Sequence, residues 1–474
     1  MQRGNYLNIS SINIEEIGMY SKQLLAYNPK RRKQFAPDKT KELKILRVLC
    51  QRPYYTGSGI NLINLTKKTA KRGLEQFVIF GHPIGEPNPL ESIIEKGNTL
   101  PVRFSKEGSP KEADVPFPVV GMSDQMPYES TKFSEFDEKI LETYLDAFAN
   151  NIMTAVDQFK PNIIHSHHLW LVTSLCRVLY PNLPVVATCH NTGLRQMELA
   201  SQLRDFMVNP IKGIDAIAVI DTSQQERVKQ IYEFEEDQGR ADQFFYIGQG
   251  INTDIFFPPR SGFPTDTPRE EFTIIYVGKL SFSKGVPQLI EAFKQLKSEE
   301  QIPCNLLLVG SGKGEEKNTI YEMAKDFDSI QFLGQLEQEE LSKYFKKSDL
   351  FVLPSFYDGF PKVLLESLSS GCRAIITDLP GIKDTLQNAC GDSDMIQYLP
   401  LPEMKSIDKP REEALPDFVD KLKILMKEQL WKCKTTEKEY GYANKIKREF
   451  SQEGLFQKYL SKYNELLSKD IKKG

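Results

Sequence analysis

Short runs of apolar residues recur along the chain and alternate with longer segments of helical periodicity. Most of the runs are continuously apolar, a pattern typical of strands that are covered on both faces within a parallel sheet. The intervening segments are long enough for helical crossovers between parallel strands, and residues 135–159 show a clear helical period. The runs lie at residues 43–49, 76–80, 162–166, 184–189, 216–220 and 244–248 in the first half, and at 272–277, 305–309, 330–333, 350–353 and 374–377 in the second.

Two halves of this kind predict an α/β protein with two Rossmann-like, doubly wound domains. Ligands of doubly wound sheets bind beyond the carboxyl ends of the strands, so two domains that face each other would enclose one deep cleft between them. A segment rich in proline and polar residues separates the halves, as interdomain linkers do. The predicted parts are a polar, basic leader (1–42), a first domain (43–257), a linker (258–271), a second domain (272–435) and a lysine-rich helical end (436–474).

Length, composition and charge restrict the class of protein. A chain of 474 residues exceeds the size of a single core, and 40% hydrophobic with 26% charged residues is ordinary for a globular protein. The net charge of −3 gives no overall positive field that would attract nucleic acid. The start lacks the apolar segment of a signal peptide, and no stretch approaches the roughly 20 apolar residues of a membrane span, so we expect a cytoplasmic protein.

The leader contains a short basic cluster, Lys30 to Lys33. One interpretation is a solvated arm. The other is a peripheral contact with anionic lipid at the inner face of a membrane, because clustered basic side chains favour anionic surfaces.

The most informative segment is SFYDGFPKVLLESLSSG, which follows the apolar run LFVLP. Pro361 suits the first turn of a helix, so Asp358 lies in the preceding loop. Gly359 and Phe360 then offer free backbone N–H groups at a positive helix end, which suits a phosphate. Glu366 interrupts an apolar helix face, and a buried carboxylate requires donors such as the two hydroxyls of a ribose. The alternative is an acid that only complements the helix dipole.

Two lysines follow the first apolar run of the second half, in the segment VGKLSFSKG. Lys279 and Lys284 are five positions apart in a loop after a strand, so both can reach one diphosphate. They would neutralise the charge of a departing nucleotide diphosphate, a task that other enzymes give to a divalent cation. Ordinary solvated lysines are the alternative.

A glycine-rich turn, YYTGSG, follows the first apolar run of the chain. Gly57 and Gly59 would allow the backbone to approach a phosphate closely. The turn lacks the complete pattern G-x-G-x-x-G of dinucleotide-binding proteins.

Four of the five histidines follow two neighbouring strands: His165, His167, His168 and His190. Imidazole is a common metal ligand, but alternate residues of an extended segment point to opposite faces, and no nearby carboxylate or cysteine completes a ligand set. We therefore expect these side chains to line the cleft and predict no metal site. The pair Asp392 and Asp394 matches a metal-binding Asp-x-Asp only by composition, as does Asp326-Phe-Asp328, and we interpret both as solvated surface.

In this order, the segments resemble the retaining glycosyltransferases of family 4, the glycosyl transferases group 1, which have the GT-B fold. YYTGSG resembles the amino-terminal glycine loop of that family, TCHNTG its Thr-x-His segment and GQGINTDIFFP its Asn-Gly-Val-Asp segment. GKLSFSKG resembles its Gly-Arg-Leu and Lys-Gly segment, and YDGFPKVLLESLSSG its Glu-Gly-Phe segment with two acids seven residues apart. The resemblance covers roughly residues 43–390.

The resemblance implies a nucleotide-diphosphate sugar, UDP- or GDP-linked, as donor, and a glycan, lipid-linked or small-molecule acceptor held on the first domain. It implies no metal or other cofactor. The residues implied for catalysis are His190, Lys279, Lys284 and Asp358. Those implied for donor binding are Gly57, Gly59, Gly310, Gly312, Gly334, Asp358, Gly359, Phe360, Pro361 and Glu366. His167, His168 and Arg195 are implied as cleft lining.

Three positions depart from the family pattern. Asp358 stands in place of Glu and is one methylene shorter. Lys279 replaces Arg and loses the bidentate geometry while it keeps the charge. Gln249 stands where Asn is common. None of the three removes a required charge.

Two other functions stay open from the sequence. One is a sugar-nucleotide epimerase or a phosphorylase on the same two-domain plan. The other is an inactive sugar-nucleotide-binding partner subunit, because fold resemblance alone does not fix function.

Overall fold

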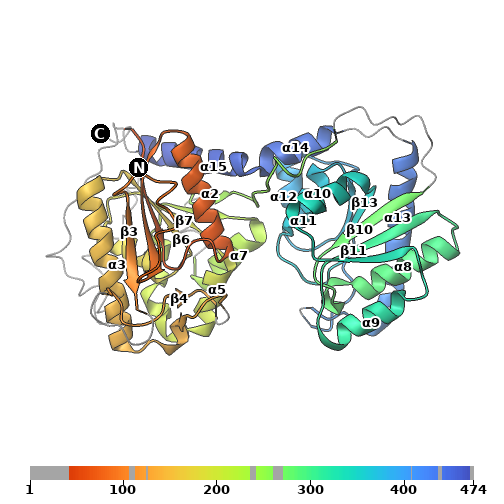
Figure 1. Ribbon diagram of the computed structural model, residues 1–474, viewed down its shortest axis with the longest axis horizontal. Helices are drawn as coiled ribbons and strands as arrows, with labels where there is room; N and C mark the ends of the chain where they lie inside the picture. Colours follow the sequence, from red (N-terminus) through yellow and green to blue (C-terminus); the bar gives the residue numbers. More distant parts are fainter. Residues whose placement is uncertain are drawn as a thin grey trace, which may run out of the picture. The chain divides into compact units, whose positions relative to one another are not determined.

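The computed structural model describes residues 42–105, 113–123, 126–234, 242–259, 271–406, 408–435 and 440–469 (Figure 1). Its contacts divide the chain into two compact units. Unit 1 comprises the chain up to Ile220, residues 224–247 and the chain from Phe456, and unit 2 comprises residues 221–223 and Gly248–Leu455. The basic cluster of the predicted leader and most of the predicted linker lie outside the described residues. The division passes to unit 2 after Ile247, ahead of that linker, and assigns the end of the chain to unit 1.

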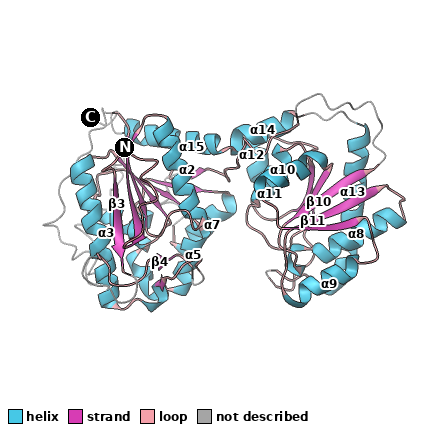
Figure 2. Cartoon of the chain, viewed as in Figure 1, coloured by secondary structure: helices cyan, strands magenta, loops and turns pink. Residues whose placement is uncertain are grey.

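A seven-stranded, fully parallel sheet forms the centre of unit 1, with the strand order β3-β2-β1-β6-β7-β8-β9 (Figure 2). The order reverses between β1 and β6, which pair directly. The short strands β4 and β5 form a separate parallel pair. The strands are β1 (Lys44–Leu49), β2 (Glu75–Pro83), β3 (Thr99–Phe104), β4 (Val120–Gly121), β5 (Thr131–Lys132), β6 (Ile163–His167), β7 (Val185–Thr188), β8 (Ala216–Val219) and β9 (Phe244–Tyr246).

Helices connect and cover these strands. The longest, α3, confirms the helix predicted over residues 135–159. Its N-cap Asp137 accepts a hydrogen bond from the Ile140 N–H, and it ends at Lys160 in the left-handed conformation. The helices are α2 (Gly57–Lys71), η3 (Phe133–Glu135), α3 (Glu138–Phe159), α4 (Leu171–Leu179), α5 (Asn191–Leu199), η4 (Ser201–Phe206), α6 (Val208–Lys212), α7 (Thr222–Ile231) and, from the end of the chain, α15 (Gln452–Lys469).

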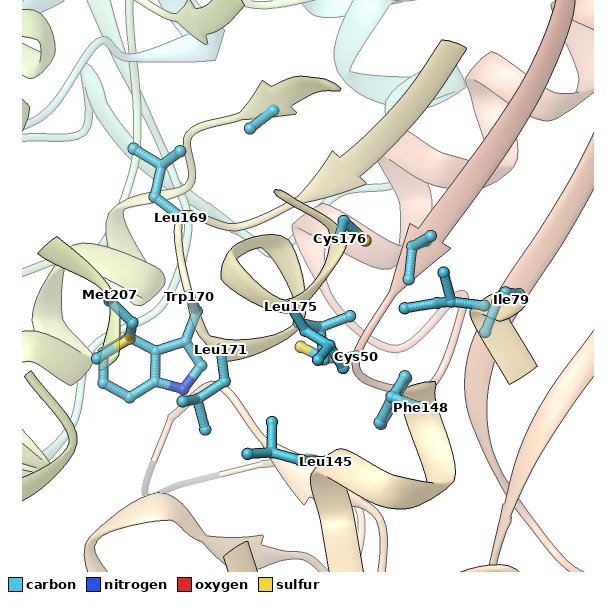
Figure 3. Packing of buried hydrophobic residues seen from close by; sticks show 14 of the residues in the cluster. Cys50, Ile79, Leu145, Phe148, Leu169, Trp170, Leu171, Leu175, Cys176 and Met207 are labelled. Carbon is cyan, nitrogen blue, oxygen red and sulfur yellow. The ribbon is translucent and has the colours of Figure 1, made fainter. Parts of the chain in front are cut away.

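The core of unit 1 lies between its sheet and the helices α3 and α4. Leu145 and Phe148 of α3 pack beside Leu171 and Leu175 of α4, with Trp170 at the start of that helix (Figure 3). All five side chains are almost fully buried. This packing fixes the segment that leads from β6 into α4.

Unit 2 contains a six-stranded, fully parallel sheet with the order β12-β11-β10-β13-β14-β15. The order reverses between β10 and β13, which pair directly. The strands are β10 (Phe272–Val277), β11 (Cys304–Val309), β12 (Ile330–Gly334), β13 (Leu350–Leu353), β14 (Arg373–Thr377) and β15 (Ile396–Leu399). The helices are η5 (Phe282–Lys284), α8 (Val286–Ser298), α9 (Gly314–Ala324), α10 (Gln338–Lys347), α11 (Lys362–Ser369), α12 (Ile382–Cys390), η6 (Glu412–Ala414), α13 (Leu415–Thr435) and α14 (Gly441–Phe450).

The two parallel sheets confirm the prediction of two doubly wound domains, and each of the eleven predicted apolar runs overlaps a strand. The sequence reasoning missed β3 and β15, which lie at sheet edges, and the short pair β4–β5. Among the helices in the described ranges, none combines the length and the apolar character that crossing a bilayer requires.

Candidate functional site

Two loops meet where the strand order of unit 2 reverses. One follows β10 and the other follows β13, and doubly wound sheets bind ligands at such a switch point. The Phe356 N–H donates to the Ser283 carbonyl over 3.0 Å, which ties the loops together. Gly285 has a φ of +66°, and a Cβ there would lie 2.1 Å from the Pro354 carbonyl oxygen. Only glycine therefore allows the two loops to approach this closely.

Lys284 and Asp358, both predicted site residues, form an ion pair across these loops. The Nζ of Lys284 lies 2.7 Å from Oδ2 of Asp358 and donates to the Tyr357 carbonyl over 3.0 Å. Lys279 is exposed and has no ion-pair partner in the described ranges, while its carbonyl accepts a 2.7 Å hydrogen bond from the Tyr276 hydroxyl. One predicted lysine is thus neutralised within the protein, and the other is available to an anion.

Glu366 is a buried carboxylate on α11. Its exposed fraction is 6%, and its neighbours Leu364, Leu365 and Leu368 are fully buried. Burial raises its pKa, and the positive charge of Lys362 partly opposes the rise. In the part of the chain that the structure describes, no side chain or N–H group donates a hydrogen bond to this carboxylate. The described part of the protein therefore leaves this carboxylate free to accept from another molecule.

Two groups that sequence reasoning did not assign support the loop before α11. Gln249, noted only as a departure, donates from Nε2 to the Phe360 carbonyl over 2.9 Å. The Phe360 ring stacks on Phe450 with centroids 6.1 Å apart. Pro361 is the N-cap residue of α11, next to its predicted place in the first turn. Phe450 lies far along the sequence in a helix that carries no motif, so no local signal marks it.

The predicted glycines of unit 2 lie in the neighbouring loops. Gly310 has a φ of +132°, and a Cβ there would lie 1.9 Å from the Gly278 carbonyl oxygen. Its N–H donates to the Gly334 carbonyl over 2.7 Å. A Cβ on Gly312 would meet the Leu280 carbonyl at 2.5 Å, whereas Gly334 and Gly359 face open space. The first two glycines thus permit loop contacts within the protein, and the last two leave room for another molecule.

In unit 1, the predicted histidines gather at the ends of β6 and β7. The rings of His165 and His167, two residues apart on one strand face, stack with centroids 4.9 Å apart. His168 has a left-handed φ of +68°, which turns its ring to within 4.7 Å of His190. His167 Nδ1 lies 3.3 Å from His190 Nε2.

These imidazoles form a neutral cluster. Burial lowers the pKa of His190 to about 4, and burial together with neighbouring positive charge lowers the pKa of His165, His167 and His168 well below the ordinary value. The Nε2 atoms of His167 and His168 are buried and have no hydrogen-bond partner among the residues that the structure describes. Within the described residues, no group of three or more His, Cys, Asp or Glu side chains is arranged to hold a metal ion. Neutral imidazoles exchange hydrogen bonds with hydroxyl groups.

The remaining predicted residues of unit 1 lie at the starts of helices. Thr56 caps α2 by accepting from the Gly59 N–H. A Cβ on Gly59 would lie 2.9 Å from the Arg52 carbonyl oxygen, whereas Gly57 faces open space. Arg195 is exposed on α5.

The two Asp-x-Asp segments lie on the surface, as expected. Asp394 pairs with Arg373 at 2.9 Å, and Asp392 accepts from Gln387. Asp326 and Asp328 are exposed.

Comparison with known proteins shows which family and which structures the chain resembles. The family described as "Glycosyl transferases group 1" matches residues 260–391. The glycogen synthase of Mycobacterium tuberculosis is 24% identical over 241 residues, which cover 48% of this chain and 55% of that protein. The chain thus matches about half the length of this curated relative.

Two solved structures share the fold. A glycosyltransferase from Rickettsia africae aligns with a TM-score of 0.55 at 17% identity, covering 90% of this chain and 99% of the other. The Anabaena protein HepE in complex with UDP and glucose aligns with a TM-score of 0.52 at 14% identity, covering 89% and 99%. Together with the two parallel sheets, these similarities show the GT-B fold. In sequence, residues 260–391 are similar to the glycosyl transferases group 1, and about half of the chain is similar to a glycogen synthase.

Proposed function

We propose that this protein is a retaining, metal-independent glycosyltransferase that moves a sugar from a nucleotide-diphosphate donor to a glycan, lipid-linked or small-molecule acceptor. Similarity to the glycosyl transferases group 1 supports the reaction class. The complex of HepE with UDP and glucose supports a UDP-sugar as the first donor to test, with GDP-sugars as the second.

The observation that carries the proposal is the carboxylate of Glu366, which accepts from no donor in the described ranges. Its helix follows the β13 loop, which contacts the one loop that carries Lys279 and Lys284. Two ribose hydroxyls would donate to Glu366 and remove the cost of an unpaired buried acceptor. Lys279 and Lys284 would contact the diphosphate, and Gly359 and Phe360 precede a helix end that favours negative charge. Gly334, which faces open space, would border the base.

Donor binding would replace the ion pair between Lys284 and Asp358 by one between Lys284 and the diphosphate. A diphosphate is the stronger partner for Lys284 because it carries more than one negative charge. When the diphosphate draws Lys284 away, Asp358 loses its ion pair and becomes free to accept hydroxyl groups of the donor sugar. The shorter Asp would act in this way in place of the Glu of the family pattern.

In the proposed reaction, the bond between the anomeric carbon and the diphosphate oxygen breaks. The acceptor oxygen forms its bond to the same face of that carbon, and its proton passes to the departing phosphate oxygen. Lys279 and Lys284 stabilise the charge that develops on the leaving group. His190, held neutral, would hydrogen-bond the reacting sugar, and His167, His168 and Arg195 would line the acceptor side.

The first experiment is calorimetric titration of the full chain with UDP, GDP and ADP, without metal and then with magnesium. We expect metal-independent binding of one nucleotide, weakened at least tenfold in Glu366→Ala, because tenfold corresponds to about 1.4 kcal/mol, the scale of a lost hydrogen bond to a charged group. Asp326→Asn, an exposed acid on the same unit, is the matched control and should bind like the wild type.

Other results decide against parts of the proposal. Binding that requires magnesium contradicts metal independence, and equal binding in wild type and Glu366→Ala contradicts the assigned site. Binding without sugar transfer across a broad acceptor set favours the inactive partner subunit. Turnover of the sugar nucleotide to an epimer without acceptor favours an epimerase, and a requirement for phosphate favours a phosphorylase.

A further inference from the structure

Exposed aromatic side chains gather at the carboxyl end of β1 in unit 1. Of the ten large hydrophobic side chains that are exposed in the described part of the chain, three lie within seven residues: Tyr54 at 42%, Tyr55 at 50% and Ile60 at 48% exposure. A loop of this kind leaves apolar surface in water, which folding alone disfavours. The cluster therefore indicates a surface that another molecule covers.

The loop is held rigidly in this conformation. Tyr54 has a φ of +73°, a left-handed backbone that a bulky side chain adopts rarely and at an energetic cost. Gly59 in the first turn of α2 packs directly under the loop, with room for no Cβ against the Arg52 carbonyl oxygen and the Tyr54 amide nitrogen, each at 2.9 Å. Gln51 Nε2 donates to the Thr56 hydroxyl, and its Oε1 accepts from the Met122 N–H over 3.4 Å. The tyrosines are thus presented on a fixed backbone.

The Arg52 side chain contacts the rings of two tyrosines at this surface. Its guanidinium lies 4.3 Å from the centroid of Tyr55 and 5.2 Å from that of Tyr128, and the two rings meet edge to face at 5.5 Å. Arg52 also donates to the Tyr55 hydroxyl over 3.2 Å. One face of Tyr55 is therefore occupied by the guanidinium, while half of the side chain stays open to solvent.

Charge determines the kind of ligand. Arg52 forms an ion pair with Glu86, so the charge of the guanidinium beside the tyrosines is compensated within the protein. The loop offers aromatic faces, tyrosine hydroxyls and a nearby carboxylate. An uncharged ring with one apolar face and several hydroxyls matches this set, because aromatic rings cover apolar C–H surface while a few polar groups fix orientation.

We propose that Tyr54 and Tyr55, supported by Arg52, Tyr128 and Glu86, form a subsite for a neutral pyranose unit of the acceptor. The proposal rests on the proposed function, since it assigns the acceptor class of that reaction. The subsite lies at the carboxyl edge of β1, whose neighbour β6 leads into the histidine cluster, and it therefore belongs to the switch point of the unit 1 sheet.

The test is saturation-transfer NMR of the full chain with four probes: the methyl α-pyranosides of glucose, mannose and galactose, and glucose 1-phosphate. At least one neutral glycoside should bind, and Tyr55→Ala should weaken it about tenfold, the effect of removing an aromatic anchor at a binding centre. Tyr55→Phe keeps the ring and should retain most of the binding. Tyr246→Ala removes another tyrosine of unit 1 that is 44% exposed, and should bind like the wild type.

Three outcomes overturn the proposal: no neutral glycoside binds, binding is equal in wild type and Tyr55→Ala, or glucose 1-phosphate alone binds. Nucleotide binding, measured separately, distinguishes this failure from failure of the proposed function. If the chain binds UDP or GDP but no glycoside, only the acceptor subsite is rejected. If it binds a glycoside but no nucleotide, the transferase function is rejected. Thermal unfolding of Tyr55→Ala checks that the variant is folded.

Discussion

At the scale of single residues, Glu366 shows how one side chain can lower stability and serve binding. The residue is 6% exposed on an apolar helix face, and its carboxylate has no hydrogen-bond donor in the described ranges. Burial raises its pKa, with Lys362 in partial opposition, so the folded protein is protonated at this residue more readily than the unfolded chain. Such a side chain does not stabilise the fold, and in our proposal it binds the ribose of the donor.

We expect Glu366→Gln to stabilise unit 2 at pH 7. An acid whose pKa is raised on folding costs nothing at a pH below its unfolded value of 4.5, and its cost grows as the pH rises through the folded pKa. Removing the charge should therefore add roughly 1 kcal/mol at pH 7, the scale of an unsatisfied buried group, and almost nothing at pH 4. Urea unfolding followed by circular dichroism at both pH values measures this difference.

Glu340→Gln, at an exposed position of α10, is the matched control and should change stability at neither pH. If Glu366→Gln is less stable than the wild type at pH 7, the carboxylate has a donor inside the protein and does not need the hydroxyls of a ribose. This result would contradict the proposed ribose site.

At the scale of elements, the start of α2 depends on the absence of a single methyl group. The loop after β1 rests against the first turn of the helix at Gly59, where backbone atoms of Arg52 and Tyr54 fill the space that a Cβ would need. At Gly57, two residues earlier in the same turn, a Cβ would meet no atom within 4 Å. Packing therefore requires glycine at position 59 of this motif but not at position 57.

We expect Gly59→Ala to destabilise unit 1 by about 1–3 kcal/mol, the cost of overpacking, because the contacting atoms belong to backbone and cannot rotate away. Gly57→Ala should stay within about 0.5 kcal/mol of the wild type, as surface substitutions do. Trp170 is buried in unit 1 and Trp431 is exposed in unit 2, so fluorescence-monitored unfolding in a Trp431→Phe background reports unit 1 alone. If the two alanine variants are equally stable, the loop after β1 can shift away from α2 to make room for the Cβ.

At the scale of the whole molecule, the end of the chain completes the first unit. Tyr459 and Tyr463 of α15 pack on the unit 1 sheet, where their hydroxyls lie 2.6 Å from the Thr188 Oγ1 and the His165 Nδ1. The buried Arg47 guanidinium contacts the same His165 nitrogen at 2.9 Å and donates to Thr69 over 2.8 Å. Residues more than 400 positions apart thus share one buried polar network with no carboxylate among the partners described.

This network and the histidine cluster make unit 1 sensitive to acid. Folding lowers the pKa of all four clustered histidines, chiefly by burial, that of His190 to about 4. The corresponding stability is fully present above the unfolded value of 6.5 and is lost as the pH falls toward and below 4. Each histidine that is protonated only on unfolding contributes a slope of up to about 1.4 kcal/mol per pH unit.

We expect the unfolding free energy of unit 1 to fall steeply between pH 6.5 and 4.5. His190→Gln should reduce the slope of this free energy against pH by up to about 1.4 kcal/mol per pH unit, the contribution of one proton. Urea titrations of Trp431→Phe, with and without His190→Gln, measure it at half-unit steps. His82→Gln is a useful comparison, because burial also lowers the pKa of His82 but the Glu86 carbonyl and charge oppose the shift. A pH-independent stability over this range would contradict the neutral cluster.

The sequence alone determined the strands of both sheets that are buried on two faces. Runs such as 272–277 and 350–353 are continuously apolar because helices cover both sides, so their pattern survives without tertiary information. The edge strands β3 and β15 were missed since TLPVRF and IQYL carry polar or proline positions that an edge tolerates. The order of the motifs also gave the resemblance to the glycosyl transferases group 1, to which residues 260–391 are similar.

Only the tertiary structure decided how the side chains pair. Sequence spacing brought Lys284 and Asp358 to one edge, but their ion pair depends on two loops that Gly285 allows to touch. The run 43–49 contains Arg47, whose partners Thr69, His165 and Tyr463 come from three other segments. Local pattern encodes which residues face a core, whereas contacts between segments far apart depend on chain folding, which brings together groups that no spacing relates.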